Sequence, residues 1–221
     1  MVLPFLDRRE ETARLRRLLR RREGGLAVLY GRRRCGKSRL LGQVLGAGRS
    51  IYYVGDDRES VLQRSALATE IGRLLPGFDR VTYPGWDGVF ERLWSEAPAG
   101  TVVAMDEFPA LAAAAREIPG LLQKHLDRSA RRGVHLLLAG SSQRMMQGLV
   151  LDRTAPLFGR AVEILKITPL PAGWILPGLS LPDAVAAIEA FAVWGGVPRY
   201  WELAAGYPSL DAAVRELILS P

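Results

Sequence analysis

The stretch over residues 26–40 constrains the fold of this chain more than any other part of the sequence. An apolar run from Leu26 to Tyr30 predicts a buried strand, and apolar residues at helical spacing from Leu40 onward predict a helix. Between them, residues 31–38 read GRRRCGKS and match the pattern G-x-x-x-x-G-K-[ST] at every defined position. Strand, glycine-rich loop and helix in this order predict a phosphate-binding loop.

The loop residues have the chemistry that phosphate binding requires. Two glycines let the backbone bring its amides close to an anion, and the start of the following helix adds partial positive charge. Lys37 is expected to reach the terminal phosphates of a nucleotide, and the Ser38 hydroxyl suits Mg²⁺, which prefers oxygen ligands. We therefore expect the nucleotide to be bound by Gly31, Arg32, Arg33, Arg34, Cys35, Gly36, Lys37, Ser38 and Arg39.

An acidic pair follows a second apolar strand. Residues 101–105 read TVVAM and lead directly into Asp106 and Glu107. In a parallel sheet the carboxyl ends of the strands form the edge at which ligands bind. We expect Asp106 to hold Mg²⁺ together with Ser38, and Glu107 to orient or deprotonate the attacking water.

Three further positions are candidates for nucleotide chemistry. Ser141 or Ser142, after the predicted strand at 134–139, is expected to sense the γ-phosphate, although capping of the next helix also explains Ser142. Arg160 precedes the last predicted strand and is expected to stabilise the charge that develops on the γ-phosphoryl group, in cis or across a subunit interface. A surface ion pair is the alternative for Arg160.

The predicted elements give an α/β fold. Strands separated by helices require crossover connections and hence a parallel sheet, here a P-loop NTPase sheet of about five strands flanked by helices. The order of the motifs suits the class in which an extra strand lies in space between the phosphate-loop strand and the acidic strand. The expected strands are residues 26–30, 50–54, 101–105, 134–139 and 161–167.

The sequence changes character after residue 168. Proline and glycine punctuate a linker, and helical patterns follow at about 182–194, 197–205 and 208–219. We expect an ATPase core over residues 1–168, a small helical lid over residues 169–221, and truncation before a further C-terminal domain. Pro198 suits the first turn of a lid helix, from which Pro198 and Arg199 are expected to reach the nucleotide; a plain helix start is the alternative.

Positive charge is concentrated at the start of the chain. Residues 1–39 carry 13 Lys and Arg against 4 Asp and Glu, whereas the whole chain of 221 residues has a net charge of only +7. The surplus suits DNA or an acidic protein partner, with a solvated helix face as the alternative. The arginines concerned lie in the first predicted helix: Arg14, Arg16, Arg17, Arg20, Arg21 and Arg22.

Composition excludes several classes of protein. Cys35 is the single cysteine, so the chain has no internal disulfide and a reducing cytoplasm is the expected location. We find no secretory segment and no apolar run long enough to span a bilayer, so no membrane partner is expected. The chain contains no asparagine, which excludes the Asn-Lys-x-Asp motif with which GTPases recognise guanine.

Six segments, taken in order, resemble those of archaeal-type AAA-like ATPases, which are related to the AAA+ and STAND ATPases. The resemblance covers almost the whole chain. It implies an ATPase domain followed by a winged-helix region and often a nuclease-like domain, and it implies that Arg8 lies near the adenine. The segments that carry it are residues 5–11, 31–38, 105–109, 139–142, 157–160 and 195–200.

These motifs together predict a Mg²⁺-dependent ATPase that couples ATP binding and hydrolysis to a conformational change, alone or as an oligomer. A switch that binds ATP with little hydrolysis and a module that associates with DNA are the alternatives. A small-molecule kinase is a more distant one, because the Asp106–Glu107 pair argues against it.

Overall fold

The computed structural model describes residues 3–46, 48–128 and 133–220. Its centre is a five-stranded sheet in the order β2-β3-β4-β1-β5, and every pair of neighbouring strands is parallel. Each predicted strand is confirmed to within one residue at either end. The strands are β1 (Gly25–Tyr30), β2 (Ser50–Val54), β3 (Val102–Asp106), β4 (His135–Gly140) and β5 (Ala161–Lys166).

The strand order places β4 between β1 and β3. The phosphate loop follows β1 and the acidic pair ends β3, so the expected extra strand between them is confirmed. All six residues of β4 are buried, whereas β2 lies at the edge of the sheet. Ser141, which follows β4, is therefore carried to a point between the loop and the acidic pair.

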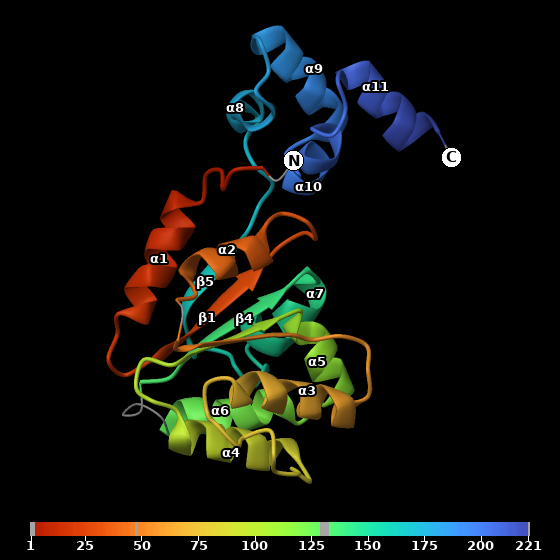
Figure 1. The fold of residues 1–221 in the computed structure, drawn as a ribbon. Helices are drawn as coiled ribbons and strands as arrows, with labels where there is room; N and C mark the ends of the chain where they lie inside the picture. The colour runs from red at the N-terminus through yellow and green to blue at the C-terminus, as the bar shows by residue number, and fades with distance from the viewer. Residues whose placement is uncertain (1–2, 47, 129–132, 221) are drawn as a thin grey trace.

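Helices cover both faces of the sheet (Figure 1). On one face, α1 (Arg9–Leu19) and α2 (Lys37–Val44) pack through Leu15, Leu18, Leu40 and Leu41 against alternate residues of the strands. The other face is covered by the larger apolar layer. Its helices are α3 (Ser60–Gly72), α4 (Trp86–Glu96), α5 (Phe108–Ala114), α6 (Ile118–Arg128) and α7 (Gln143–Met146), the last continuing into a π-helical turn, η1 (Gln147–Leu151). The helix α6 is described as far as Arg128, and residues 129–132 lie outside the described part of the chain.

The chain after β5 forms a second group of helices beyond the sheet (Figure 1). These pack around their own apolar cluster, which includes Ile175, Trp194 and Trp201 and also takes in Leu3 from the other end of the chain. The elements are η2 (Ala172–Trp174), α8 (Ile175–Leu179), α9 (Ala184–Trp194), α10 (Pro198–Ala204), α11 (Leu210–Val214) and η3 (Arg215–Leu219).

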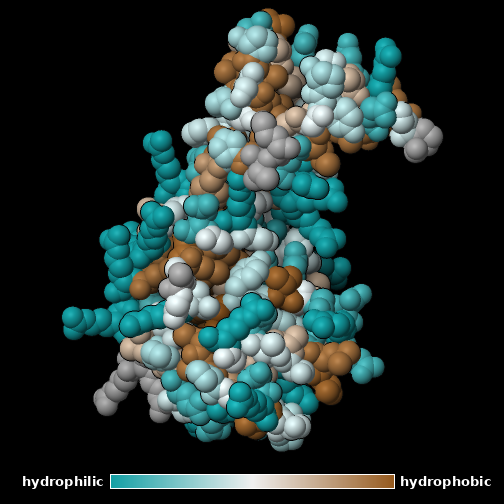
Figure 2. Space-filling view, viewed as in Figure 1, coloured by the Kyte–Doolittle hydropathy of each residue, from teal (hydrophilic) through white to brown (hydrophobic). Residues whose placement is uncertain are grey.

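Apolar side chains also lie on the surface of this group, and Figure 2 shows them over α8 and α9. Ile188 is 70% exposed and Val185 is 65% exposed. Among the described residues, no single helix has the length and apolar character to cross a membrane. The bent pair Ala172–Leu179 and Ala184–Trp194, with 108° between its arms, meets those two criteria only when both helices are taken together.

Candidate nucleotide-binding site

The phosphate loop is anchored at its first glycine. Gly31 has φ +148°, and a Cβ placed there would lie 2.1 Å from the carbonyl oxygen of Ile167, just beyond β5. Gly36 has φ +93° but open space around the same position, so its requirement is conformational alone. The loop therefore leaves the sheet against the neighbouring strand and turns into α2 at Lys37.

Lys37 is buried in the loop that it is expected to serve. The residue is 5% exposed, and its Nζ donates hydrogen bonds to the carbonyl oxygens of Gly31 at 2.8 Å and Arg32 at 3.1 Å. Burial lowers the pKa of Lys37, while the nearby carboxylates of Glu107 and Asp106 act in the opposite direction. An anionic phosphate in front of the loop would supply a stronger partner than two neutral carbonyls.

The acidic pair lies beside this lysine at the end of β3. Asp106 is 2% exposed; its Oδ1 accepts from the backbone N–H of Glu107 at 2.9 Å, and its Oδ2 accepts from the hydroxyl of Tyr52 at 2.9 Å. Burial and the Asp106 carboxylate raise the pKa of Tyr52 to about 12, so the phenol remains a donor at neutral pH. Glu107 follows with φ +48°, a strained left-handed conformation that turns the chain into α5.

Ser141 holds the second carboxylate of the pair. Both its hydroxyl, at 2.8 Å, and its backbone N–H, at 3.3 Å, donate to Oε2 of Glu107. Ser142 is used differently, because its hydroxyl accepts from the N–H of Met145 at 3.4 Å and caps α7. Of the two predicted sensors, the structure therefore brings Ser141 to the site and leaves Ser142 as a helix cap.

The oxygen atoms of Ser38 and Asp106 suit Mg²⁺. Asp106 is a buried carboxylate that forms no ion pair among the described residues, and a buried charge of this kind calls for a cation. The described residues contain no cluster of three His, Cys, Asp or Glu that would hold a metal by itself. Magnesium that arrives with nucleotide phosphates needs no such cluster, because one or two protein ligands suffice.

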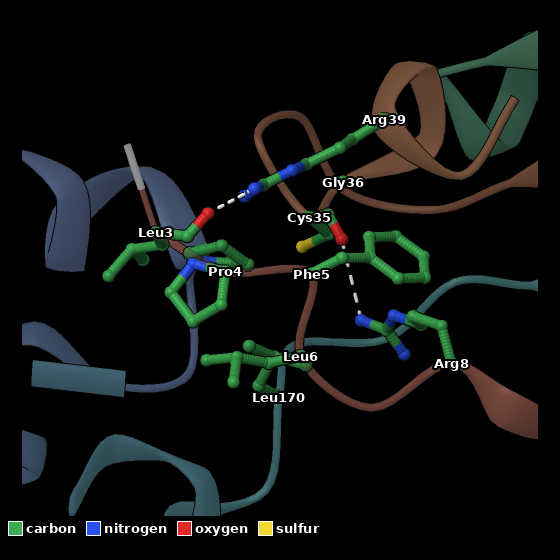
Figure 3. Close-up of a pocket in the computed structure, with 10 residues that line it drawn as sticks. Leu3, Pro4, Phe5, Leu6, Arg8, Cys35, Gly36, Arg39 and Leu170 are labelled. Carbon is green, nitrogen blue, oxygen red and sulfur yellow. Dashed lines mark hydrogen bonds between the residues drawn. The ribbon is translucent and has the colours of Figure 1, made fainter. Parts of the chain in front are cut away.

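A pocket adjoins the loop on the side of the N-terminal segment (Figure 3). Its free volume is about 30 Å³, room for one or two water molecules but not for a nucleotide base. Arg8 is 4% exposed and donates to the carbonyl oxygens of Cys35, at 3.4 Å, and of Thr168. The pocket is lined by Leu3, Pro4, Phe5, Leu6, Arg8, Cys35, Gly36, Arg39, Leu170 and Pro198. Burial raises the pKa of the Cys35 thiol, which favours its role as a protonated filler of the loop.

The remaining arginines of the predicted site point in other directions. Arg39 donates to the carbonyl oxygen of Leu3 and reaches Glu202 of α10 at 3.5 Å, as Figure 3 shows for the first of these contacts. Arg199 is paired with the same Glu202, on its own helix α10, at 3.1 Å. The other loop arginines, Arg32, Arg33 and Arg34, are exposed and form no ion pair in the described part of the chain.

Arg160 lies at the amino end of β5, whereas the phosphate loop lies at the carboxyl end of the neighbouring strand β1. Ala161, its neighbour, pairs with Leu26 near the start of β1, whereas the loop begins after Tyr30; five residues of strand span roughly 16 Å. The Arg160 guanidinium instead forms two hydrogen bonds of 2.8 Å with Asp127. The structure does not bring Arg160 to the loop of its own chain, so only action across a subunit interface stays a prediction.

Sequence reasoning did not find Tyr52. The residue lies on β2, and it meets Asp106 only because β2 pairs with β3 in the register that sets Tyr52 opposite Ala104 and Val54 opposite Asp106. That pairing is a long-range property with no local pattern. The one available signal was the double tyrosine in an otherwise apolar edge strand.

A curated protein and several solved structures resemble this chain. No family model matches the chain. An uncharacterized protein of Methanocaldococcus jannaschii is 27% identical over 201 residues, which is 90% of this chain but 43% of that protein, so the chain spans less than half of its relative's length.

Solved structures resemble the fold over nearly its full length. A Walker-type ATPase of Pyrococcus abyssi has a TM-score of 0.71 at 19% identity, covering 95% of this chain and 70% of that one. The Orc1 protein of Aeropyrum pernix, solved in complex with DNA, has a TM-score of 0.64 at 20% identity and coverage of 97% and 62%. A STAND protein with a tetratricopeptide repeat sensor from Pyrococcus horikoshii has a TM-score of 0.62 at 14% identity and coverage of 98% and 33%.

At these identities the likeness establishes the fold. The chain has the fold of the archaeal AAA-like P-loop ATPases that its motifs resemble.

Proposed function

We propose that this chain binds ATP with Mg²⁺ and hydrolyses it. The observation that carries the proposal is the convergence of Lys37, Asp106, Glu107 and Ser141 at one edge of the sheet, beside a loop that is shaped for phosphate. In this proposal Lys37 exchanges its two carbonyl partners for the β- and γ-phosphates. Ser38 and Asp106 would hold the Mg²⁺ that accompanies ATP, which neutralises phosphate charge.

Glu107 is the proposed base for the attacking water. In the structure Ser141 holds its carboxylate through two donors. A γ-phosphate is a competing acceptor for the Ser141 hydroxyl, and its arrival would leave Glu107 free to accept a proton from water. Ser141 thereby links the presence of the γ-phosphate to the availability of the base.

We further propose that the chain divides at residues 168 and 169 into an ATPase core and a helical lid that moves with the nucleotide. Arg39 supports this, because it follows Ser38 on α2 and contacts both Leu3 and Glu202 of α10. The pocket beside it is too small for adenine, so the N-terminal segment and α10 would have to shift when ATP enters. The proposed location is the cytoplasm, in keeping with the free, buried thiol of Cys35.

The test is ATP binding and single-turnover hydrolysis with Mg²⁺ in the native chain and in two variants. Glu107→Gln should bind ATP but lose hydrolysis by about 10²–10⁴-fold, because the base is gone while the phosphate contacts remain. Lys37→Ala should lose binding. Glu117→Gln, the same change at an exposed glutamate, is the matched control and should behave as the native chain does.

Two results would contradict this proposal. If the native chain binds ATP tightly without turnover, the ATP-gated switch replaces the ATPase. If Glu107→Gln and Glu117→Gln turn over at equal rates, Glu107 is not the base.

Association with DNA is a second candidate, favoured by a groove of about 620 Å³ along α1. Arg9, Arg16 and Arg20 line it and form no ion pair among the described residues, and Trp174 and Phe5 add aromatic surface. Guanidinium groups beside aromatic rings suit a nucleic-acid backbone and its bases. The Orc1 relative, which was solved with DNA, gives this candidate further support.

A further inference from the structure

The Tyr52 hydroxyl contacts the site but takes no part in the proposed hydrolysis. It donates to Oδ2 of Asp106 at 2.9 Å, and the Ser38 side chain lies near the same hydroxyl. The two residues expected to hold Mg²⁺ thus lie beside one phenol. A group in this place affects how both ligands are presented to a cation.

The position of Tyr52 is set by the sheet. Tyr52 lies opposite Ala104, and Asp106 is two residues further along β3 on the same face, so the tyrosine ring extends along that face toward the edge where the phosphates would bind. The ring packs against the apolar layer under α1 and α2. Because the ring is held by packing, the hydroxyl has little freedom to leave the carboxylate.

Asp106 is oriented by donors on both of its oxygens. The N–H of Glu107 fixes Oδ1, and the Tyr52 hydroxyl fixes Oδ2. Each carboxylate oxygen accepts more than one hydrogen bond or metal contact, so both retain capacity toward a cation or its water. The backbone donor cannot be removed by substitution, which leaves the phenol as the adjustable part of this arrangement.

We propose that Tyr52 is a positioning residue for the Mg²⁺ that accompanies ATP, fixing the Asp106 carboxylate so that it and Ser38 face the cation together. This rests on the proposed function. Groups that hydrogen-bond to metal ligands set the ligand's orientation, and their removal typically lowers metal affinity by about 10–100-fold. Tyr52 therefore acts on the metal through Asp106 and not on the phosphates.

The chain supplies a matched control at the next residue. Tyr53 lies on the same strand but faces the opposite layer, where its hydroxyl donates to Gln63 at 3.2 Å. Tyr53→Phe removes the same atom from the same strand, away from Asp106. A change seen in Tyr52→Phe and not in Tyr53→Phe comes from the site and not from a weakened β2.

The experiment measures the dissociation constant of a non-hydrolysable ATP analogue with Mg²⁺ and with EDTA. The constant in EDTA divided by the constant with Mg²⁺ gives the contribution of the metal to binding. We expect Tyr52→Phe to leave binding in EDTA unchanged and to lower the ratio by about tenfold. Tyr53→Phe should keep the native ratio, and the melting temperature of each variant without nucleotide verifies its fold.

A second pair of variants tests the route through Asp106. In the Asp106→Asn background, Tyr52→Phe should cause no further fall in the ratio, because the carboxylate that it positions is already absent. An additional fall would overturn the proposal. So would an unchanged or increased ratio in Tyr52→Phe, or an equal fall in Tyr53→Phe.

The failure of the proposed function gives a different result. If Mg²⁺ does not change the affinity of the native chain for the analogue, the Mg²⁺ part of the function and the role of Tyr52 fall together. If Mg²⁺ strengthens binding in the native chain and in Tyr52→Phe to the same degree, only the role of Tyr52 falls.

Discussion

At the scale of single residues, the two glycines of the phosphate loop meet different demands. Gly31 combines a positive φ with a carbonyl oxygen 2.1 Å from the place of a Cβ, whereas Gly36 has the positive φ and open space. The motif specifies glycine at both positions. At Gly31 glycine is required by the close packing against Ile167, just beyond β5, whereas at Gly36 it is required only by the backbone conformation of the loop.

We therefore predict that Gly31→Ala destabilises the chain by more than about 4 kcal/mol, since the methyl group collides with backbone that cannot rotate away. Gly36→Ala should cost only about 1–2 kcal/mol, the usual penalty of a left-handed conformation. Urea denaturation of both variants measures the difference. Equal midpoints would show that the contact with Ile167 is relieved by a small shift.

At the scale of elements, α1 divides its arginines between two tasks. Arg14 and Arg17 bind Glu163 of β5, each at 2.8 Å or closer, and fix the helix to the sheet. Burial alone would raise the pKa of Glu163, but the hydrogen bonds from Arg17 and Arg14 outweigh it and lower that pKa. The face with Arg16 and Arg20 remains for solvent or a partner, and Figure 2 shows hydrophilic side chains projecting on this side of the molecule.

If this face binds DNA, the double variant Arg16→Gln/Arg20→Gln should weaken binding and reduce the slope of log affinity against log salt by about 2, one unit for each lost phosphate contact. Fluorescence anisotropy with labelled duplex at several salt concentrations measures this. Arg73→Gln, at the residue that follows α3, is the control. A native chain with no salt-dependent binding would rule out DNA at α1.

The elements also explain which parts of the site were predictable. The phosphate loop and the Asp106–Glu107 pair are local patterns, so their place at the ends of β1 and β3 follows from the sequence alone. Ser141 was separated from Ser142 only by the turn after β4. Tyr52 depended on the long-range pairing of β2 with β3. The place of Arg160 follows from the parallel direction of β5, because a residue before a parallel strand lies at the amino ends of the strands, away from the loop.

At the scale of the whole molecule, Arg160 bears on assembly. Its guanidinium lies on the edge of the sheet away from the loop and is paired with the exposed Asp127. An arginine there reaches phosphate only if a second copy presents its own loop. The expected catalytic role of Arg160 is therefore a question of oligomeric state.

We predict that Arg160→Ala binds ATP within about twofold of the native affinity at concentrations where the native chain sediments as a monomer, because surface changes far from a site have small effects. If turnover of the native chain rises with protein concentration, that rise should be absent in Arg160→Ala. Turnover measured across a concentration series tests this. Weakened ATP binding by the monomeric variant would instead place Arg160 at its own site.

The N-terminal segment carries a mechanical consequence for the whole molecule. Leu3 packs into the apolar cluster of the C-terminal helices, while α1 belongs to the sheet, so the chain passes between the two bodies once near its start and again after β5. Arg8 joins the two crossings through the carbonyl oxygen of Thr168. A group of helices joined to the sheet by one connecting segment can rotate in any direction. Two adjacent connecting segments restrict that rotation to a hinge about the line through both. We therefore expect motion of the C-terminal helices to be a hinge rotation about the line through these two crossings.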